Sequence, residues 1–395
     1  MRILPVMAAL ASAPVAFATD VSEVAASMLA DAEMRAFLSK GAATYDGGFR
    51  ITPDDPDAPR LTIKGFFQTR LFLNAADDFE SGFVLPRARL DFRVAMPRPK
   101  LQLRINTELA GSRGPRMLDV YGVYDNDDGF RVRFGQFRGR FNRAHGMTSV
   151  SRQLGLDRPL NDVIFRINRV QGLEFTFQGE RVRTFATVSD GRASLNSDFI
   201  SDRSADFALT GRVETRLGDA SWRQYRDYTA FPDDDFGVLL GLGGHWQEGG
   251  ATTAAADFGG RFGAVTFDVG LEGPGWNLSA SVNGRWVDSG EETFEDYGFD
   301  VQGGAFITDD AELFAAYNHV WIDNDRGGTD FPSIGAGGNW YIAGHALKFT
   351  VQATYYPEPT TDLGTLFTGR IASLGLLTDV DGDQVVIGAQ MQISF

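Results

Sequence analysis

Apolar and polar residues alternate with a period of two through most of the chain beyond residue 61. Between residues 384 and 395 the odd positions are apolar and the even positions are polar or small, with Val386 as the exception. The same alternation recurs in 101–109, 207–217, 264–272, 276–286 and 347–355. Because successive side chains of a strand point to opposite faces, this pattern predicts strands with one apolar and one polar face.

About sixteen such strands are expected, a number within the range of membrane barrels. They fall near 61–73, 83–96, 101–110, 117–124, 130–137, 170–178, 181–189, 205–217, 236–246, 264–272, 276–288, 298–307, 312–323, 333–342, 346–356 and 384–395. A soluble β-sandwich also alternates, with its apolar face inward. Here charged residues such as Arg104, Arg212 and Asp268 recur in the middle of long strands, which suits a water-filled lumen and a lipid-facing exterior.

The fold class that follows is all-β, a transmembrane antiparallel β-barrel over residues 61–395. Because lipid offers no partner for backbone groups, the sheet must close, and we expect the last strand to pair with the first. Short connections are expected in the periplasm, whereas the long segments 247–263 and 357–383 are expected outside. The connection 218–235 is long where a short turn is due, so it is either an enlarged periplasmic turn or a slip in the strand count. Segment 312–323 also alternates poorly, since Phe314, Val320 and Ile322 fall on the lumen face.

The N-terminal residues predict export. Residues 1–18 combine Arg2, an apolar stretch and small residues near Ala18, as in a cleaved signal peptide. Residues 19–60 are expected to form a periplasmic extension, with a weak helical pattern over 21–39 and a linker over 40–60. This extension is either a plain tail or a segment that helps to trimerise or plug the barrel.

Composition agrees with this class and excludes others. The 395 residues include 46 Gly and 32 Phe, which suits many tight turns and aromatic girdles, and no Cys, which removes thiol chemistry and disulfides. The formal charge of −15 argues against nucleic-acid binding. The four His lie on different segments, and 379–383 departs from a calcium loop, so we expect no metal site and no cofactor. No nucleophile-elbow sequence is present, and we expect no enzyme.

Three stretches resemble one family, the phosphate-selective porin O/P family of outer-membrane channels. They are GNWYIAGHALK at 338–348, GQFRGRF at 135–141 followed by NRVQGL at 168–173, and the segment 83–90. The resemblance implies a sixteen-stranded, usually trimeric diffusion channel. In this family the loop between the motifs at 135–141 and 168–173 folds into the barrel. It also implies that Lys348 faces the lumen. The terminal Phe395 is similar to the residue that closes outer-membrane barrels and is read by the barrel-assembly machinery.

The chemistry expected in the pore is that of arginine, because guanidinium groups bind phosphate or carboxylate bidentately and stay charged. The connection 138–169 has a net charge of +5, from Asp157, Asp162 and seven arginines: Arg138, Arg140, Arg143, Arg152, Arg158, Arg166 and Arg169. A basic ladder on the early strands is expected from Lys64, Arg70, Arg87, Arg89, Arg93, Arg104, Arg131 and Arg133. These positions predict a constriction with a modest preference for anions such as phosphate.

Other interpretations stay open at this point. The basic connection could be a solvated outer loop, and the ladder could be ordinary lumen lining balanced by Asp91 and Glu108. The phosphate-specific members of the family use lysines deep in the pore, whereas 138–169 contains no Lys, so a general or weakly anion-selective porin is equally compatible. The competing class is a structural or adhesive barrel with a plugged lumen.

Overall fold

The computed structural model describes residues 43–45, 47–53, 55, 57–97, 100–111, 114–199, 201–250, 260–288, 293–323, 330–361 and 371–395. The predicted signal peptide and the helix expected within 21–39 lie outside these residues. Within the described residues, no helix is both long enough and apolar enough to cross a membrane.

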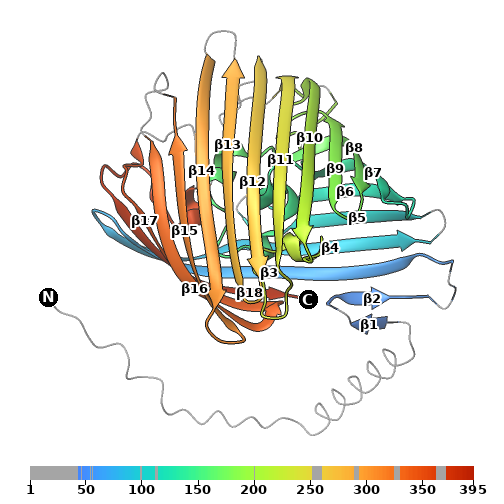
Figure 1. Ribbon diagram of the computed structural model, residues 1–395. Coiled ribbons are helices and arrows are strands. Elements are labelled where there is room, and N and C mark those ends of the chain that lie inside the picture. Colours follow the sequence, from blue (N-terminus) through green and yellow to red (C-terminus); the bar gives the residue numbers. More distant parts are fainter. Residues whose placement is uncertain are drawn as a thin grey trace, which may run out of the picture.

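The wall of the molecule is a closed barrel of sixteen antiparallel strands, β3 to β18 (Figure 1). Their bounds are β3 Arg60–Ala75, β4 Phe79–Met96, β5 Leu101–Glu108, β6 Arg116–Asp125, β7 Phe130–Arg138, β8 Arg169–Gln178, β9 Val182–Ser189, β10 Ala205–Gly218, β11 Gly237–Gly249, β12 Arg261–Gly273, β13 Trp276–Asp288, β14 Thr293–Phe306, β15 Ala311–Trp321, β16 Phe331–His345, β17 Leu347–Tyr356 and β18 Gln384–Ser394. Every strand predicted from the alternation is present, and the predicted fold class is confirmed.

Closure occurs between β18 and β3, in a register that runs from Val385 opposite Ala75 to Ser394 opposite Phe66. Just beyond β18, the backbone N–H and C=O of Phe395 exchange hydrogen bonds of 3.0 and 2.8 Å with Gly65. The Phe395 ring lies over Gly65, where a Cβ atom would collide with it. Since every strand is paired on both sides, the wall has no free edge.

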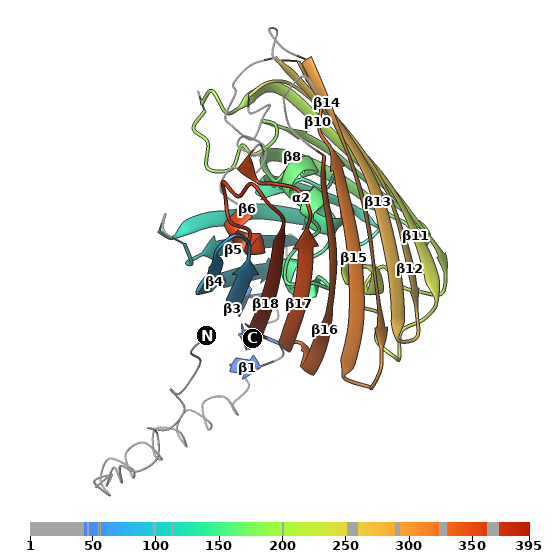
Figure 2. The same ribbon diagram turned by 90° about the vertical axis from the view of Figure 1, so that its left-hand side faces the viewer.

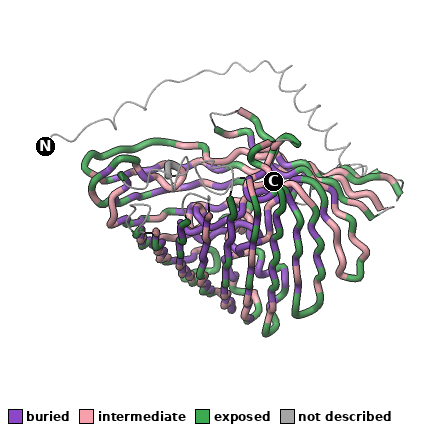
Figure 3. The backbone as a smooth tube through the Cα atoms, turned by 90° about the horizontal axis from the view of Figure 1, so that it is seen from above, coloured by how far each residue is buried: buried purple, intermediate pink, exposed green. Residues whose placement is uncertain are grey.

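Buried and exposed residues alternate along the strands of the wall, as the sequence pattern predicts (Figure 3). On β12, Val265 and Phe267 are exposed on the outside, whereas Thr266 and Asp268 are buried toward the lumen. Such an arrangement places apolar side chains against lipid and polar side chains inside the barrel.

Connections at the two ends of the barrel differ in length. At the end near Phe395 they are mostly tight, such as 126–129, 179–181 and 274–275, which marks this end as periplasmic. The exception is 219–236, which joins β10 to β11 at this end without adding a strand. Of the two interpretations of this segment, the enlarged turn is therefore correct.

A small hairpin lies within the predicted linker, at the periplasmic end. It consists of β1 (Ala43–Tyr45) and β2 (Phe49–Ile51), and β2 pairs with the start of β3. The Phe49 ring packs edge-on against Phe395, with centroids 6.0 Å apart. The short helices are η1 (Arg143–Met147), η2 (Val150–Arg152), α2 (Leu160–Phe165), η3 (Gln224–Arg226) and η6 (Ile371–Leu374).

Candidate pore constriction

The connection between β7 and β8, residues 139–168, lies inside the barrel and carries η1, η2 and α2 (Figure 2). We call it the lumen loop. Leu154, Ile164 and Phe165 are almost completely buried in it. A loop this apolar would expose its core if it stood in solvent, so its sequence favours an inward path.

The lumen loop packs on apolar side chains that interrupt the polar face of the wall. Val320, Ile322 and Val386 form one buried cluster with Leu156 and Leu160 of the loop. Phe314 packs against Leu154 in a second cluster. The positions that break the alternation in the sequence are therefore the ones on which the loop is seated. We call this side of the barrel, β14–β18 and β3, the seat wall.

Polar side chains of the seat wall bind the backbone of the loop. Lys348 Nζ donates to the carbonyl of Gln153 at 2.8 Å, so this lysine faces the lumen as the family resemblance implies, but it is buried against the loop. Four wall amides add to this attachment: Asn318, Asn339, Gln352 and Gln392 bond the backbone of Leu160, Leu154, Leu156 and Ser151 at 2.9–3.1 Å. Buried backbone groups of an irregular loop need such partners.

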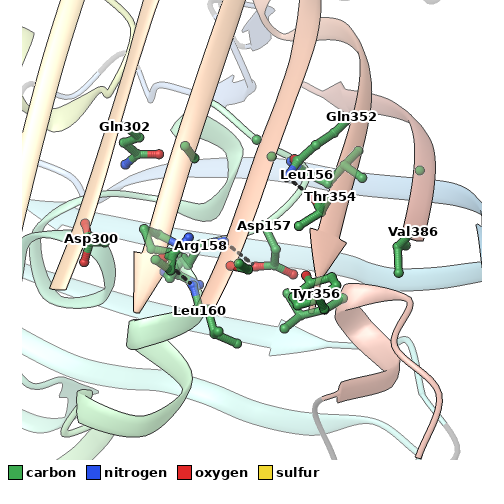
Figure 4. A pocket seen from close by; sticks show the side chains of 18 of the residues that line it. Leu156, Asp157, Arg158, Leu160, Asp300, Gln302, Gln352, Thr354, Tyr356 and Val386 are labelled. Carbon is green, nitrogen blue, oxygen red and sulfur yellow. Dashed lines mark hydrogen bonds between the residues drawn. The ribbon is translucent and has the colours of Figure 1, made fainter. Parts of the chain in front are cut away.

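Asp157 is the charged centre of this contact (Figure 4). Its carboxylate accepts hydrogen bonds from Arg87 at 2.8 and 2.9 Å and from Arg70 at 3.2 Å. Burial alone would raise the pKa of Asp157, but Arg87, Arg70 and Arg158 hold it well below its usual value. A cavity of about 60 Å³ remains between this part of the loop, β14 and β17, so little space is left along the seat wall.

The seven arginines of the predicted constriction lie at or in the lumen loop, and each has a hydrogen-bond or carboxylate partner. Arg138 donates to the carbonyls of His145 and Thr148. The other six have a carboxylate within 4.0 Å: Arg140 has Glu174, Arg143 has Glu272, Arg152 has Asp227, Arg158 and Arg166 have Asp162, and Arg169 has Asp119. Asp162 pairs with arginines of the loop itself, whereas Asp157 pairs with Arg70 and Arg87 of the wall. The net +5 therefore overstates the free positive charge, because wall carboxylates oppose it.

The residues of the predicted basic ladder also have different partners: some bind the lumen loop, and others pair with carboxylates of the wall. Arg70 and Arg87 hold Asp157, and Lys64 lies against Gly47 and Gly48 at the periplasmic rim rather than in the constriction. The remaining members each have one or two carboxylate partners: Arg89 with Glu108, Arg93 with Asp91, Arg104 with Asp91 and Asp119, Arg131 with Asp125, and Arg133 with Glu174.

The open part of the lumen lies along β5–β9, which we call the open wall. A cavity of about 420 Å³ lies between these strands and Gly146 and Met147 of the lumen loop. Seven arginines line it against Asp119, Asp125 and Glu174, so the lining side chains alone sum to +4, while Asp91 and Glu214 behind the lining pair with Arg104 and Arg183; the seven are Arg104, Arg131, Arg133, Arg138, Arg140, Arg183 and Arg226. Guanidinium groups here also stack on rings, with Arg133 4.0 Å from the centroid of Phe137 and Arg140 4.6 Å from that of Phe185.

Two of these arginines, Arg183 and Arg226, were not predicted from the sequence as pore residues. Arg183 occupies a lumen position of β9, where the alternation alone could have identified it. Arg226 belongs to the connection 219–236, and no signal indicated that this turn enters the barrel. Among the described residues, no group of three or more His, Cys, Asp or Glu side chains is suited to hold a metal ion.

The fold is that of outer-membrane porins. An anion-selective porin from Comamonas acidovorans is similar over 86% of this chain and 100% of its own, with a TM-score of 0.60 and 12% identity. The outer-membrane channel DcaP of Acinetobacter baumannii is similar over 86% and 99%, with a TM-score of 0.55 and 14% identity. Salmonella typhi OmpF, in a complex with daunomycin, is similar over 89% and 100%, with a TM-score of 0.57 and 11% identity.

No protein-family description matches the sequence. No curated protein matches it either. The likeness therefore establishes the fold, whereas the phosphate-selective family remains a resemblance carried by the quoted motifs.

Proposed function

We propose that this chain is an outer-membrane porin through which small hydrophilic solutes diffuse passively, with a modest preference for anions such as phosphate. The observation that carries the proposal is the open cavity of about 420 Å³ with its net charge of +4. Two similar structures are described as an anion-selective porin and an outer-membrane channel. The proposal involves no catalysis and no cofactor.

The local charge matters more than the global one. Salt screens charges beyond about 8 Å at physiological ionic strength, so the acidic surface contributes little to an ion inside the cavity. The low-dielectric wall focuses the field of the nearby guanidinium groups. A local +4 should therefore outweigh the formal −15 of the whole chain.

The test is the zero-current potential of the purified protein in a planar bilayer across a KCl gradient. Wild type should conduct in steps and favour chloride, and Arg138→Ala/Arg140→Ala should shift the potential toward potassium. The absence of stepwise conductance would favour the structural barrel with a plugged lumen. Conductance that favours potassium in wild type would remove the anion preference but keep the channel.

We infer that the functional unit is a homotrimer in the outer membrane, reached after signal-peptide cleavage near Ala18. The family resemblance supports this, and a similar structure, OmpT of Vibrio cholerae, is described as a trimer form (TM-score 0.52, 13% identity, 85% of this chain and 100% of that chain). Unheated gel mobility compared with chemical cross-linking in intact membranes tests the number of subunits.

Phe395 is proposed to act in assembly with the barrel-assembly machinery, beside its contact with Gly65. Deleting Phe395 removes two closing hydrogen bonds and the ring that covers Gly65. Membrane insertion should fall while export continues. The amount of heat-modifiable barrel in outer-membrane fractions measures this, and a normal amount would count against the assembly role.

A further inference from the structure

The connection 219–236, which we call the inward turn, is folded against the inside of the barrel at its periplasmic end. Ala220, Tyr225, Thr229 and Ala230 are fully buried in it. Turns at this end of outer-membrane barrels are usually short and exposed. Burial of this degree indicates that the inward turn is part of the lumen.

Its contacts fix it to three separated parts of the wall. Trp222 Nε1 donates to the carbonyl of Gly179 in the β8–β9 turn at 3.0 Å. The Thr229 hydroxyl is 2.7 Å from the Tyr341 hydroxyl of β16. The carbonyl of Phe231 accepts from the backbone of Gly275 in the β12–β13 turn at 3.1 Å. The inward turn therefore reaches across the periplasmic mouth.

The inward turn also meets the lumen loop from below. Asp227 accepts two hydrogen bonds of 2.5 Å from Arg152, and its carbonyl accepts one of 3.0 Å from Arg143. The Arg143 guanidinium lies 4.6 Å from the ring centroid of Tyr228. Two inward segments, one from each end of the barrel, thus support each other.

One side chain of the inward turn faces the open cavity. Arg226 lines it together with Arg131 and Arg140, whereas Arg223, three residues earlier, does not. Both arginines are exposed. Although its surface is exposed, partial desolvation within the lumen lowers the pKa of Arg226, and the neighbouring charges of Arg140, Arg152 and Arg131 lower it further while Asp227 raises it. Arg226 therefore interacts electrostatically with the arginines that line the cavity, and it would also attract an anion in the cavity.

We propose that the inward turn is a second constriction at the periplasmic mouth and that Arg226 is a charge-selecting residue for anions with phosphate or carboxylate groups. This inference rests on the proposed channel function but concerns a different segment from the lumen loop. An anion crossing the cavity would pass the arginines of the open wall and Arg226 at its periplasmic exit.

The absence of cysteine from the chain allows a clean test. Arg226→Cys and Arg223→Cys are compared in bilayers, before and after reaction with methanethiosulfonate reagents that attach either a sulfonate or an ammonium group. The thiolate attacks the reagent sulfur to form a mixed disulfide, and a sulfinate leaves. Heat-modifiable mobility confirms that each variant is folded.

Arg226→Cys should shift the zero-current potential toward potassium. The sulfonate reagent should increase that shift severalfold and lower the conductance, and the ammonium reagent should reverse it. Arg223→Cys should respond to neither reagent. If wild type conducts but the two variants behave alike, the inference is wrong and the channel proposal stands; if wild type does not conduct, the channel proposal itself fails.

Discussion

The seat wall and the open wall both carry basic side chains, but these side chains have different roles in the two places. On the seat wall, Arg70 and Lys348 are buried and bind the lumen loop. On the open wall, the side chains of Arg131 and Arg104 stay 39% and 22% exposed although each has a carboxylate partner. A basic residue in the lumen is therefore a pore residue only where the loop does not cover it.

The comparison also shows how the barrel can be wide and still have a narrow path. Sixteen-stranded barrels leave an aqueous channel, and here the loop packs against β14–β18 and β3 and, through Phe141 and Ile167, also against β12 and β13. The remaining cavity is next to strands that carry three of the eight residues of the predicted basic ladder, namely Arg104, Arg131 and Arg133. On the proposed channel function, selectivity would depend on which wall the loop occupies.

The largest expected effect comes from breaking the ion pairs that hold Asp157 of the lumen loop to Arg70 of β3 and Arg87 of β4. Asp157→Asn leaves Arg70 and Arg87 without a carboxylate partner, and removing one partner of a buried pair costs about 3–5 kcal/mol. The lumen loop should leave its seat, so that conductance becomes larger and noisier and the loop becomes sensitive to proteases.

Asp125→Asn on the open wall is the matched control. Its partner Arg131 is 39% exposed, and exposed pairs contribute at most about 1 kcal/mol. Urea unfolding and single-channel traces should therefore be near those of wild type. Equal damage from both substitutions would mean that the two walls do not differ as described.

The sequence predicts features that depend on neighbouring residues, but it does not predict contacts between residues far apart in the chain. Alternation is a local property, so all sixteen strands were predictable. The partners of the arginines were not, because Arg70 meets Asp157 and Lys348 meets Gln153 only through tertiary structure. Val386 was visible as an exception in an otherwise polar face, and such exceptions are the signal from which a loop seat could be predicted.

A smaller effect is expected from the apolar part of the seat. Val386→Thr keeps the side-chain volume but buries a hydroxyl beside Leu156, with an expected cost of about 1–3 kcal/mol if no hydrogen bond forms. Noise in the open-channel current should rise less than in Asp157→Asn. Val385→Thr, on the exposed outer face, is the control, and a larger effect there would contradict the assignment of faces.

The smallest effect concerns the junction between the inward turn and the lumen loop. Burial raises the pKa of Asp227 to about 6, with Arg152 and Arg143 opposing the rise and Asp234 adding to it. His345 Nε2 lies 3.8 Å from the same carboxylate. Because the folded state holds this proton more tightly than the unfolded chain, whose Asp pKa is about 3.9, the stabilisation is complete below that value and is lost as pH rises through about 6.

Acidification from pH 7 to pH 5 should therefore neutralise Asp227, weaken its attraction for Arg152 and leave the periplasmic mouth one charge more positive. The zero-current potential should move slightly toward chloride in wild type. At pH 7, Asp227→Asn should already have the zero-current potential that wild type reaches at pH 5. Its potential should change less on acidification, and other carboxylates account for the change that remains. An identical pH response in the two proteins would show that the junction does not reach the conduction path, and that the open wall alone sets the charge seen by the ion.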